Sequence, residues 1–155
     1  MGDFRLREVT KDDLPVFFEH QKDSAANRMA AFQARDWDAF QTHWIQILAN
    51  LAVIKKTIDM NGKVAGYIMV FESAGEQEIG FWIGKEFWGN GIATGALTEF
   101  LGQVSVRPLS AVVAKHNRGS LRVLEKCGFK IVGEDKKFAN IGGEVVEGII
   151  LKLAP

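Results

Sequence analysis

The stretch 87–97 constrains the fold most strongly, because it joins an apolar strand-like run, 79–83, to a helix-like pattern through closely spaced glycines. After the glycines, apolar residues recur with the spacing of one helix face. They are Ile92, Ala93, Ala96, Leu97, Phe100, Leu101 and Val104. A strand, a glycine-rich turn and a helix start together predict an anion site, since the first helical N–H groups have no internal partner and glycine lets a phosphate approach the backbone.

This loop does not match the common phosphate-binding motifs. Gly89-x-Gly91 followed by Thr94 lacks the third glycine of the dinucleotide fingerprint, and no Gly-Lys-Ser/Thr sequence marks a Walker loop. A helix cap without a ligand therefore stays open at this point. A nucleotide-binding domain, which would take ATP or NAD, stays open as well.

Length and charge exclude several classes of protein. A chain of 155 residues predicts a single domain, 1–155, with a core of its own. Lys plus Arg and Asp plus Glu both total 19, which argues against bulk electrostatic binding to nucleic acid or to anionic membranes. The single cysteine, Cys127, excludes an intrachain disulfide, and we find neither an apolar signal core nor a bilayer-length apolar run. We therefore expect a cytoplasmic protein with no nucleic acid and no membrane as partner.

Periodicity predicts a mixed α/β (α+β) chain. Its order is strand, two helices, three strands, helix, strand, helix and two strands. The segment 22–35 lacks a steady period and is interpreted as a loop or a broken helix, while Asn61-Gly62 predicts a tight hairpin turn. The predicted strands are 4–9, 53–60, 63–71, 78–84, 109–115, 129–138 and 144–153, and the predicted helices are 10–20, 37–51, 91–104 and 117–126.

A second motif, 116–129, reads His-Asn-x-x-Ser-x-x-x-Leu-Glu-Lys-Cys-Gly-Phe. With it, the first motif Trp-Gly-Asn-Gly-Ile-Ala-Thr at 88–94 and the element order, the chain resembles the GNAT superfamily of acyl-CoA-dependent N-acetyltransferases. It looks closest to the RimJ/RimL-like branch. The resemblance covers essentially the whole chain. It implies a GNAT fold, with a mixed, mostly antiparallel central sheet of about seven strands and about four helices.

The resemblance implies acetyl-CoA as co-substrate. It implies that the backbone of residues 81–83 pairs with pantetheine, and that Asn117 contacts the coenzyme; a helix N-cap is the alternative role for Asn117. Arg118 and Arg122 are candidates to bind the adenosine 3′-phosphate. The alternative is that these two arginines lie on a solvated helix face. The implied coenzyme-binding residues are Phe81, Trp82, Ile83, Gly89, Asn90, Gly91, Ile92, Ala93, Thr94, Asn117, Arg118 and Arg122.

Direct transfer to an amine needs a neutral nitrogen and a proton for the departing thiolate. Glu78 opens the strand before the loop and is the candidate base, acting through one water; a surface carboxylate beside Glu76 is the alternative. Many family members carry a Tyr in the second-motif helix that protonates the thiolate. This chain has Leu124 at that position. Ser120 is then the remaining candidate acid, or it positions the substrates. The three histidines show no metal-ligand spacing, so we expect no metal.

The acceptor is expected over the strand ends opposite the coenzyme, between walls from 25–35 and 136–143. We predict an acetyl-CoA-dependent N-acetyltransferase that acts by direct attack in a ternary complex. The acceptor is a primary amine, either a protein N-terminus or a small molecule. Because Leu124 replaces the Tyr that protonates the thiolate in many family members, a non-catalytic acyl-CoA-binding module of the same fold is the alternative. Monomer and homodimer are both compatible with the sequence.

Overall fold

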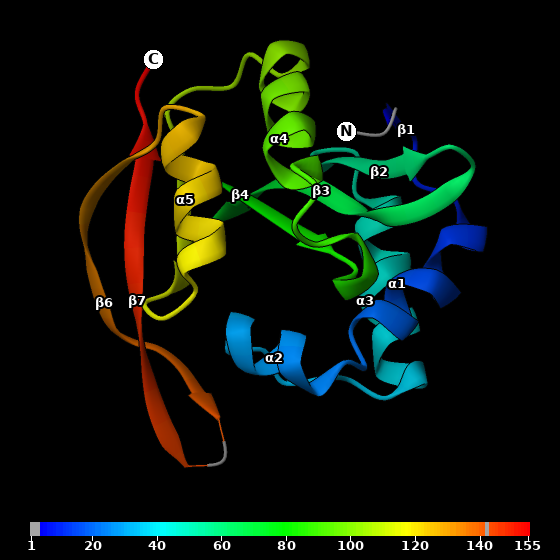
Figure 1. The fold of residues 1–155 in the computed structure, drawn as a ribbon, viewed down its shortest axis with the longest axis horizontal. Helices are drawn as coiled ribbons and strands as arrows, with labels where there is room; N and C mark the ends of the chain where they lie inside the picture. The colour runs from blue at the N-terminus through cyan, green and yellow to red at the C-terminus, as the bar shows by residue number, and fades with distance from the viewer. Residues whose placement is uncertain (1–3, 142) are drawn as a thin grey trace.

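The computed structural model describes residues 4–141 and 143–155, and its strands form one seven-stranded sheet in the order β1-β2-β3-β4-β5-β7-β6 (Figure 1). Two single-turn 3-10 helices, η1 (Lys11–Asp13) and η2 (Lys85–Phe87), accompany five α-helices in the described part of the chain. The strands are β1 (Arg5–Arg7), β2 (Ile54–Met60), β3 (Lys63–Ser73), β4 (Glu76–Ile83), β5 (Leu109–Ala114), β6 (Lys130–Ile141) and β7 (Glu144–Leu153). The α-helices are α1 (Leu14–His20), α2 (Ser24–Ala30), α3 (Trp37–Ala49), α4 (Ile92–Gln103) and α5 (Arg118–Lys126).

The sheet is mostly antiparallel, and β4 with β5 is its one parallel pair in the described chain. These two strands pair at a single position, Glu78 opposite Ser110. Parallel strands normally bond along their length. Here β4 and β5 separate beyond this point, which confirms the predicted mixed sheet and creates a gap between their carboxyl ends.

The order of elements follows the prediction, with α2 as an additional helix in the segment that the sequence left as a loop or a broken helix. Asp23 caps this helix, because its Oδ1 accepts a hydrogen bond from the Ala26 N–H at 2.9 Å. Ala31 ends it in a left-handed conformation, with φ of 53°. A helix of seven residues shows too little periodicity to be recognised as one from sequence.

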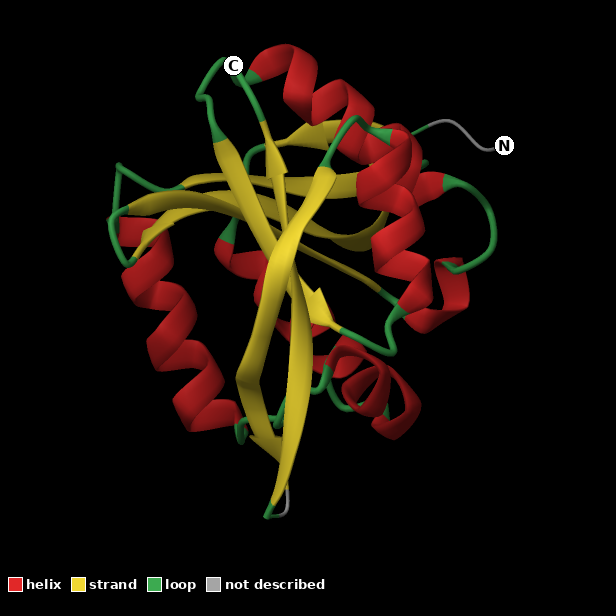
Figure 2. Ribbon diagram, turned by 90° about the vertical axis from the view of Figure 1, so that its left-hand side faces the viewer, coloured by secondary structure: helices red, strands yellow, loops and turns green. Residues whose placement is uncertain are grey.

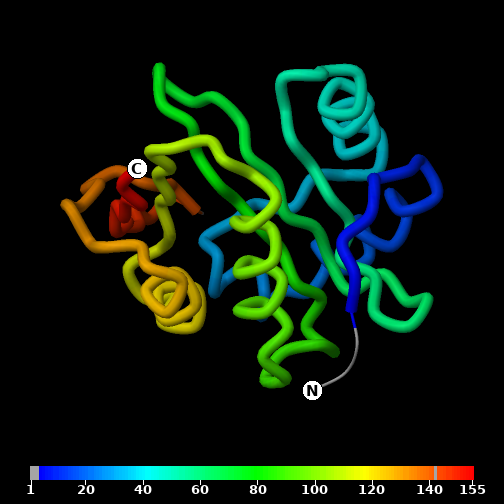
Figure 3. The backbone as a smooth tube through the Cα atoms, turned by 90° about the horizontal axis from the view of Figure 1, so that it is seen from above, coloured from blue at the N-terminus to red at the C-terminus, as the bar shows by residue number. Residues whose placement is uncertain are grey.

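Two apolar clusters lie on opposite faces of the sheet. On β3, Ile68 and Val70 face a cluster that includes Leu97 and Phe100 of α4, while Met69 faces Phe17 of α1 and aromatic residues of α3. This alternation is the period of a strand with both faces covered. Figure 2 shows helices on both sides of the twisted sheet, and Figure 3 shows α3 and α4 with β3 and β4 between them.

The predicted turn at Asn61-Gly62 is confirmed, since both residues have the positive φ that a two-residue hairpin requires, 54° and 89°. A similar pair, Ala74-Gly75, joins β3 to β4, so β4 begins at Glu76, two residues before the predicted start. The closing hairpin is confirmed as β6 and β7, although Gly142 in its predicted turn lies outside the described residues. No helix of the described chain is long and apolar enough to cross a membrane.

A polar network fixes the N-terminal elements to the sheet. The Arg7 guanidinium donates to both carboxylate oxygens of Asp13, at 2.9 and 2.8 Å, and to Asp59 at 3.0 Å. Asp13 also accepts from the Thr57 hydroxyl at 2.8 Å and from the Thr10 N–H at 2.9 Å. Burial works to raise the pKa of Asp13, but its hydrogen bonds and the Arg7 charge together hold that pKa below its usual value.

Candidate active site

The gap between β4 and β5 opens into a cleft of about 500 Å³. Its walls come from the end of β4, the glycine loop, the first turn of α4, one side of α5, and the residues of α2 that face the cleft. The lining residues are Ala26, Met29, Ala30, Phe81, Trp82, Ile83, Phe87, Trp88, Gly89, Gly91, Ile92, Ala93, Thr94, Asn117, Gly119, Ser120, Arg122, Val123 and Lys126. Most of the residues predicted to bind the coenzyme are therefore brought to one cleft.

The glycine loop takes a conformation that favours glycine at two positions. Gly89 and Gly91 have φ of 80° and 72°, and Gly91 is the N-cap of α4. A Cβ at Gly89 would meet no atom within 4 Å, so its backbone lies open on the surface of the loop. Ile92 is buried in the core and anchors the first turn of α4. Asn90, between the two glycines, is exposed and does not line the cleft.

The indole of Trp88 turns back onto the end of β4. Its Nε1–H donates to the carbonyl oxygen of Ile83 at 2.9 Å. The next residue, Gly84, donates its N–H to the Ala65 carbonyl on the β3 side. Backbone groups alternate between the two edges of a strand, so those of Ile83 and Phe81 point toward the gap. The Trp82 backbone consequently faces β3, and Trp82 contributes its side chain to the cleft.

Helix α5 presents the second motif to the same cleft. The Oδ1 of Asn117 accepts from the Ser120 N–H at 3.3 Å, so Asn117 caps the helix and also lines the cleft. Ser120 and Arg122 line it too, whereas Arg118 lies with Arg122 on a second, outer hollow of α5. Leu124, at the position where many family members have Tyr, is fully buried in the core and has no proton to give.

Glu78 lies at the junction where β4 and β5 are still paired, outside the lining of the cleft. It is partly buried. Burial, and then the neighbouring charge of Glu76, raise the pKa of Glu78 above its ordinary value. Glu76 itself pairs with Lys152 at 2.7 Å. A partly buried carboxylate with a raised pKa suits the predicted role of general base, but Glu78 does not line the cleft, and the role stays a prediction.

The one tyrosine of the chain is not placed as an acid. The Tyr67 hydroxyl accepts a hydrogen bond from Gln21 Nε2 at 3.0 Å, and its ring packs against Phe17 and Trp44. Burial raises the pKa of Tyr67 to about 12, so the hydroxyl keeps its proton in the core. Among the described residues, no group of three or more His, Cys, Asp or Glu side chains has the geometry to hold a metal ion.

Helix α2 closes the open side of the cleft, and it lies in the segment 25–35 that is expected to form one wall of the acceptor site. At its start, Asp23 lies 3.9 Å from the Nζ of Lys85, just after β4. At its end, the Arg28 carbonyl lies 2.7 Å from Nε2 of His116, just after β5. The helix therefore spans the separated ends of the two strands. His116 thus serves as a tether for α2, and sequence periodicity carries no signal for such a long-range contact.

The chain belongs to the GNAT acetyltransferase family. The family model described as "Acetyltransferase (GNAT) domain" matches residues 3–130, which include both motifs. No curated protein matches the sequence. The predicted membership of the superfamily is confirmed, and the enzyme class is acetyltransferase. The RimJ/RimL-like branch remains a prediction.

Solved structures of similar fold extend over the whole chain. Spermidine N-acetyltransferase from Vibrio cholerae in complex with CoA and spermine has a TM-score of 0.84 at 16% identity, covering 97% of this chain and 95% of that one. Microcin C7 self immunity acetyltransferase MccE in complex with acetyl-CoA and AMP has 0.79 at 17%, covering 99% and 93%. Mycobacterium smegmatis RimJ in complex with CoA-disulfide has 0.77 at 22%, covering 99% and 82%. At these identities the likeness confirms the fold.

Proposed function

We propose that this protein transfers an acetyl group from acetyl-CoA to a primary amine by direct attack in a ternary complex. One observation carries the proposal. The single parallel pair of the described sheet separates after Glu78, and the glycine loop that begins α4 lies at the open end of the resulting cleft. Membership of the GNAT family and the CoA-bound proteins of similar fold support the same assignment.

The cleft supplies groups that suit each part of the coenzyme. The backbone N–H groups of residues 89–94, with the Thr94 hydroxyl, would hold the pyrophosphate at the positive end of α4. The gap-facing backbone of Phe81 and Ile83 would pair with pantetheine as a missing strand would. Asn117 would contact the coenzyme from the start of α5. Arg118 and Arg122 would take the 3′-phosphate where the two hollows meet.

Chemistry in this cleft requires two proton movements. The amine nitrogen forms a bond to the thioester carbonyl carbon, and the C–S bond then breaks to release the coenzyme thiolate. The nitrogen loses its proton through one water to Glu78, whose raised pKa suits it to that transfer. The thiolate takes a proton from Ser120 or from solvent, because Leu124 has no acidic proton and the Tyr67 hydroxyl is hydrogen-bonded to Gln21 beside the second apolar cluster.

A non-catalytic acyl-CoA-binding module is the second candidate. Two observations favour it: Leu124 replaces the usual acid, and Glu78 does not line the cleft. Both candidates require coenzyme binding, but only the enzyme requires turnover.

The two candidates separate in one experiment. We would incubate the protein with acetyl-CoA and a panel of primary amines, and follow both thiol release and the acetylated amine by mass spectrometry. The enzyme predicts equal amounts of thiol and acetyl-amine. Tight coenzyme binding with no acetyl-amine from any acceptor would favour the binding module. The variants Glu78→Gln and Ser120→Ala then test the two assigned roles.

A further inference from the structure

Phe32 and Trp82 form an edge-on aromatic pair at the cleft. Trp82 lines the cleft, and the ring of Phe32 packs edge-on against it with centroids 5.2 Å apart. The indole Nε1 of Trp82 is buried, and no described residue accepts its hydrogen bond. A buried N–H donor without an acceptor is costly unless a ligand completes it. A bound substrate with a hydrogen-bond-accepting group would satisfy this donor.

Two arginines without a carboxylate partner in the described chain lie near Phe32. The Arg35 guanidinium lies 5.5 Å from the centroid of the Phe32 ring. Arg28 and Arg35, which we call the arginine rim, are both exposed, and neither has a carboxylate within 4.0 Å among residues 4–141 and 143–155. The segment 25–35 that holds them contains no Asp or Glu.

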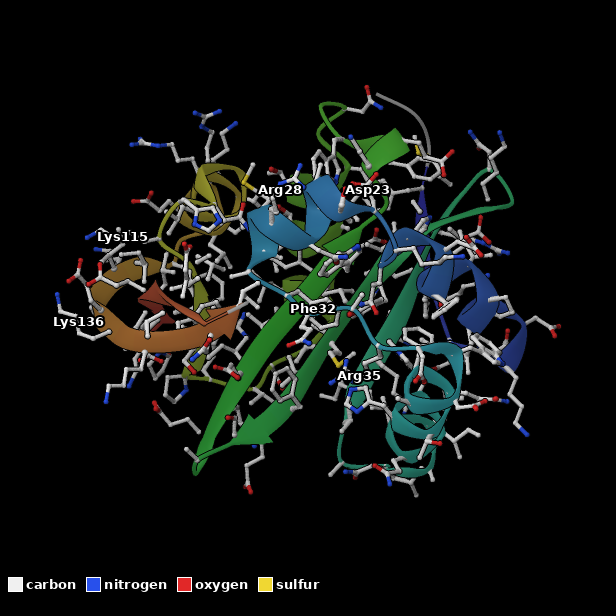
Figure 4. All side chains as sticks on the ribbon, turned by 90° about the horizontal axis from the view of Figure 1, so that it is seen from below. Asp23, Arg28, Phe32, Arg35, Lys115 and Lys136 are labelled. Carbon is white, nitrogen blue, oxygen red and sulfur yellow. The ribbon has the colours of Figure 1, made fainter. Side chains whose placement is uncertain are left out.

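The cations across the cleft from the rim are already neutralised. Lys115 lies 3.1 Å from Glu134 and 3.5 Å from Glu147, and Lys136 contacts the same two carboxylates. In Figure 4, Arg28 and Arg35 lie on either side of Phe32, while Lys115 and Lys136 lie together near the orange strand. On the α2 side, Asp23 is opposite Lys85, and Asp36, the residue after Arg35, accepts a hydrogen bond from the Ala39 N–H at the start of α3. Arg28 and Arg35 are thus the basic side chains of segment 25–35, and no described carboxylate contacts either of them within 4.0 Å.

From this placement we infer that the acceptor is a primary amine that carries a carboxylate or another anionic group close to its nitrogen. Arginine binds carboxylates through paired N–H donors, and the unsatisfied Trp82 Nε1 adds a third donor. A polyamine, in contrast, would bring further positive charges against the rim. The inference rests on the proposed acetyl transfer and selects among its acceptors.

The test compares acceptors that differ only in the anionic group. One set is an α-amino acid, its amide and the decarboxylated amine, built on leucine and phenylalanine side chains. A second set is the amidated dipeptides Ala-Glu and Ala-Gln, which separates a peptide N-terminus from a free amino acid as source. Spermidine completes the panel. We expect kcat/KM to be about tenfold or more higher for the anionic member of at least one set.

The variant Arg35→Gln should remove most of that preference by raising KM for anionic acceptors, while Arg35→Lys retains part of it. The turnover of neutral acceptors should change little in either variant. Lys63→Gln removes one positive charge from the exposed β2–β3 hairpin and is the matched control, with the preference unchanged. Circular dichroism confirms that each variant is folded.

The possible outcomes distinguish the inference from the proposed function. Equal turnover of anionic and neutral acceptors, a preference for spermidine, or an unchanged preference in folded Arg35→Gln would overturn the inference and leave acetyl transfer standing. If no acceptor is acetylated although acetyl-CoA binds, the proposed function fails and the inference fails with it.

Discussion

The indole Nε1–H of Trp88 donates a hydrogen bond to the carbonyl oxygen of Ile83 at 2.9 Å, and this contact joins the glycine loop to the end of β4. This hydrogen bond fixes the glycine loop relative to the end of β4. The loop is proposed to hold the pyrophosphate, and the strand end is proposed to pair with pantetheine. Trp88 itself is 42% exposed, so its ring contributes modestly to the core.

Trp88→Phe should therefore weaken coenzyme binding more than it weakens the fold. Phe keeps the ring but loses the donor, and we expect the Kd for acetyl-CoA to rise about fivefold, as for one lost neutral hydrogen bond. The free energy of unfolding should fall by less than about 1 kcal/mol. Calorimetric titration and urea unfolding measure the two effects. Trp37→Phe, at an indole of similar exposure on α3, should change neither binding nor the loop. Unchanged affinity in Trp88→Phe would contradict the coupling.

Glu78→Gln should lower kcat/KM by about 10²-fold or more if Glu78 is the base, and it should remove the low-pH limb that belongs to this group. A base acts when deprotonated, so the raised pKa of Glu78 moves that limb upward from the ordinary carboxylate range. The matched variant Glu76→Gln removes the neighbouring negative charge, so the pKa of Glu78 falls and the limb moves to lower pH. A pH–rate profile with an unchanged limb in Glu78→Gln would refute the role.

Asn117→Asp separates the two roles of Asn117. Asp is as good an N-cap as Asn, so the free energy of unfolding should be nearly unchanged, whereas Asn117→Ala should cost about 1 kcal/mol. A carboxylate in the cleft wall should repel the anionic coenzyme and raise its Kd about tenfold. Thermal unfolding and acetyl-CoA titration of both variants provide the check. Wild-type affinity in Asn117→Asp would leave Asn117 as a helix cap alone.

The Arg7–Asp13–Asp59 network should make stability depend on pH. Both carboxylates have pKa values held below their usual range, so the stability they contribute is present above about pH 4 and is lost as pH falls through the lowered values. Arg7→Gln leaves Asp13, which is 3% exposed, without its cation and should cost about 3 kcal/mol at pH 7.

Urea unfolding at pH 3, 5 and 7 measures this dependence. The difference between Arg7→Gln and the wild type should shrink at the lowest pH, because the unfolded carboxyl groups, with ordinary pKa values of about 3.9, bind protons there. Arg5→Gln is the control, because the Arg5 side chain is 74% exposed and lies 3.8 Å from Asp59, and it should cost less than about 1 kcal/mol. A pH-independent loss in Arg7→Gln would show that the network acts by packing alone.

Local patterns predicted most of the fold. Asn61-Gly62 marked its hairpin because two-residue turns require positive φ, and the α4 face was visible from the spacing of Ile92, Ala96 and Phe100. Helix α2 showed no regular apolar spacing because it is short. Contacts to Lys85 and His116, which lie far away in the sequence, hold it in place.

Within the site, sequence motifs located the glycine loop and the start of α5 because both depend on local backbone conformation. Side-chain contacts across long sequence distances carried no such signal. The Trp88 bond to Ile83, the Gln21 bond to Tyr67 and the edge-on contact of Phe32 with Trp82 all depend on how separate elements pack. The catalytic roles of Glu78 and Ser120 stay predictions for the same reason.

We propose that the cleft beneath the glycine loop binds acetyl-CoA, and calorimetric titration of the wild type and of Gly91→Asp measures that binding. Gly91 has positive φ at the N-cap of α4, so Asp there adds bulk and negative charge to the proposed pyrophosphate cradle. We expect saturable binding of acetyl-CoA to the wild type, no binding of ATP or NAD, and loss of acetyl-CoA binding in a folded Gly91→Asp. A folded wild type that does not bind acetyl-CoA, or a Gly91→Asp variant of unchanged affinity, would contradict it.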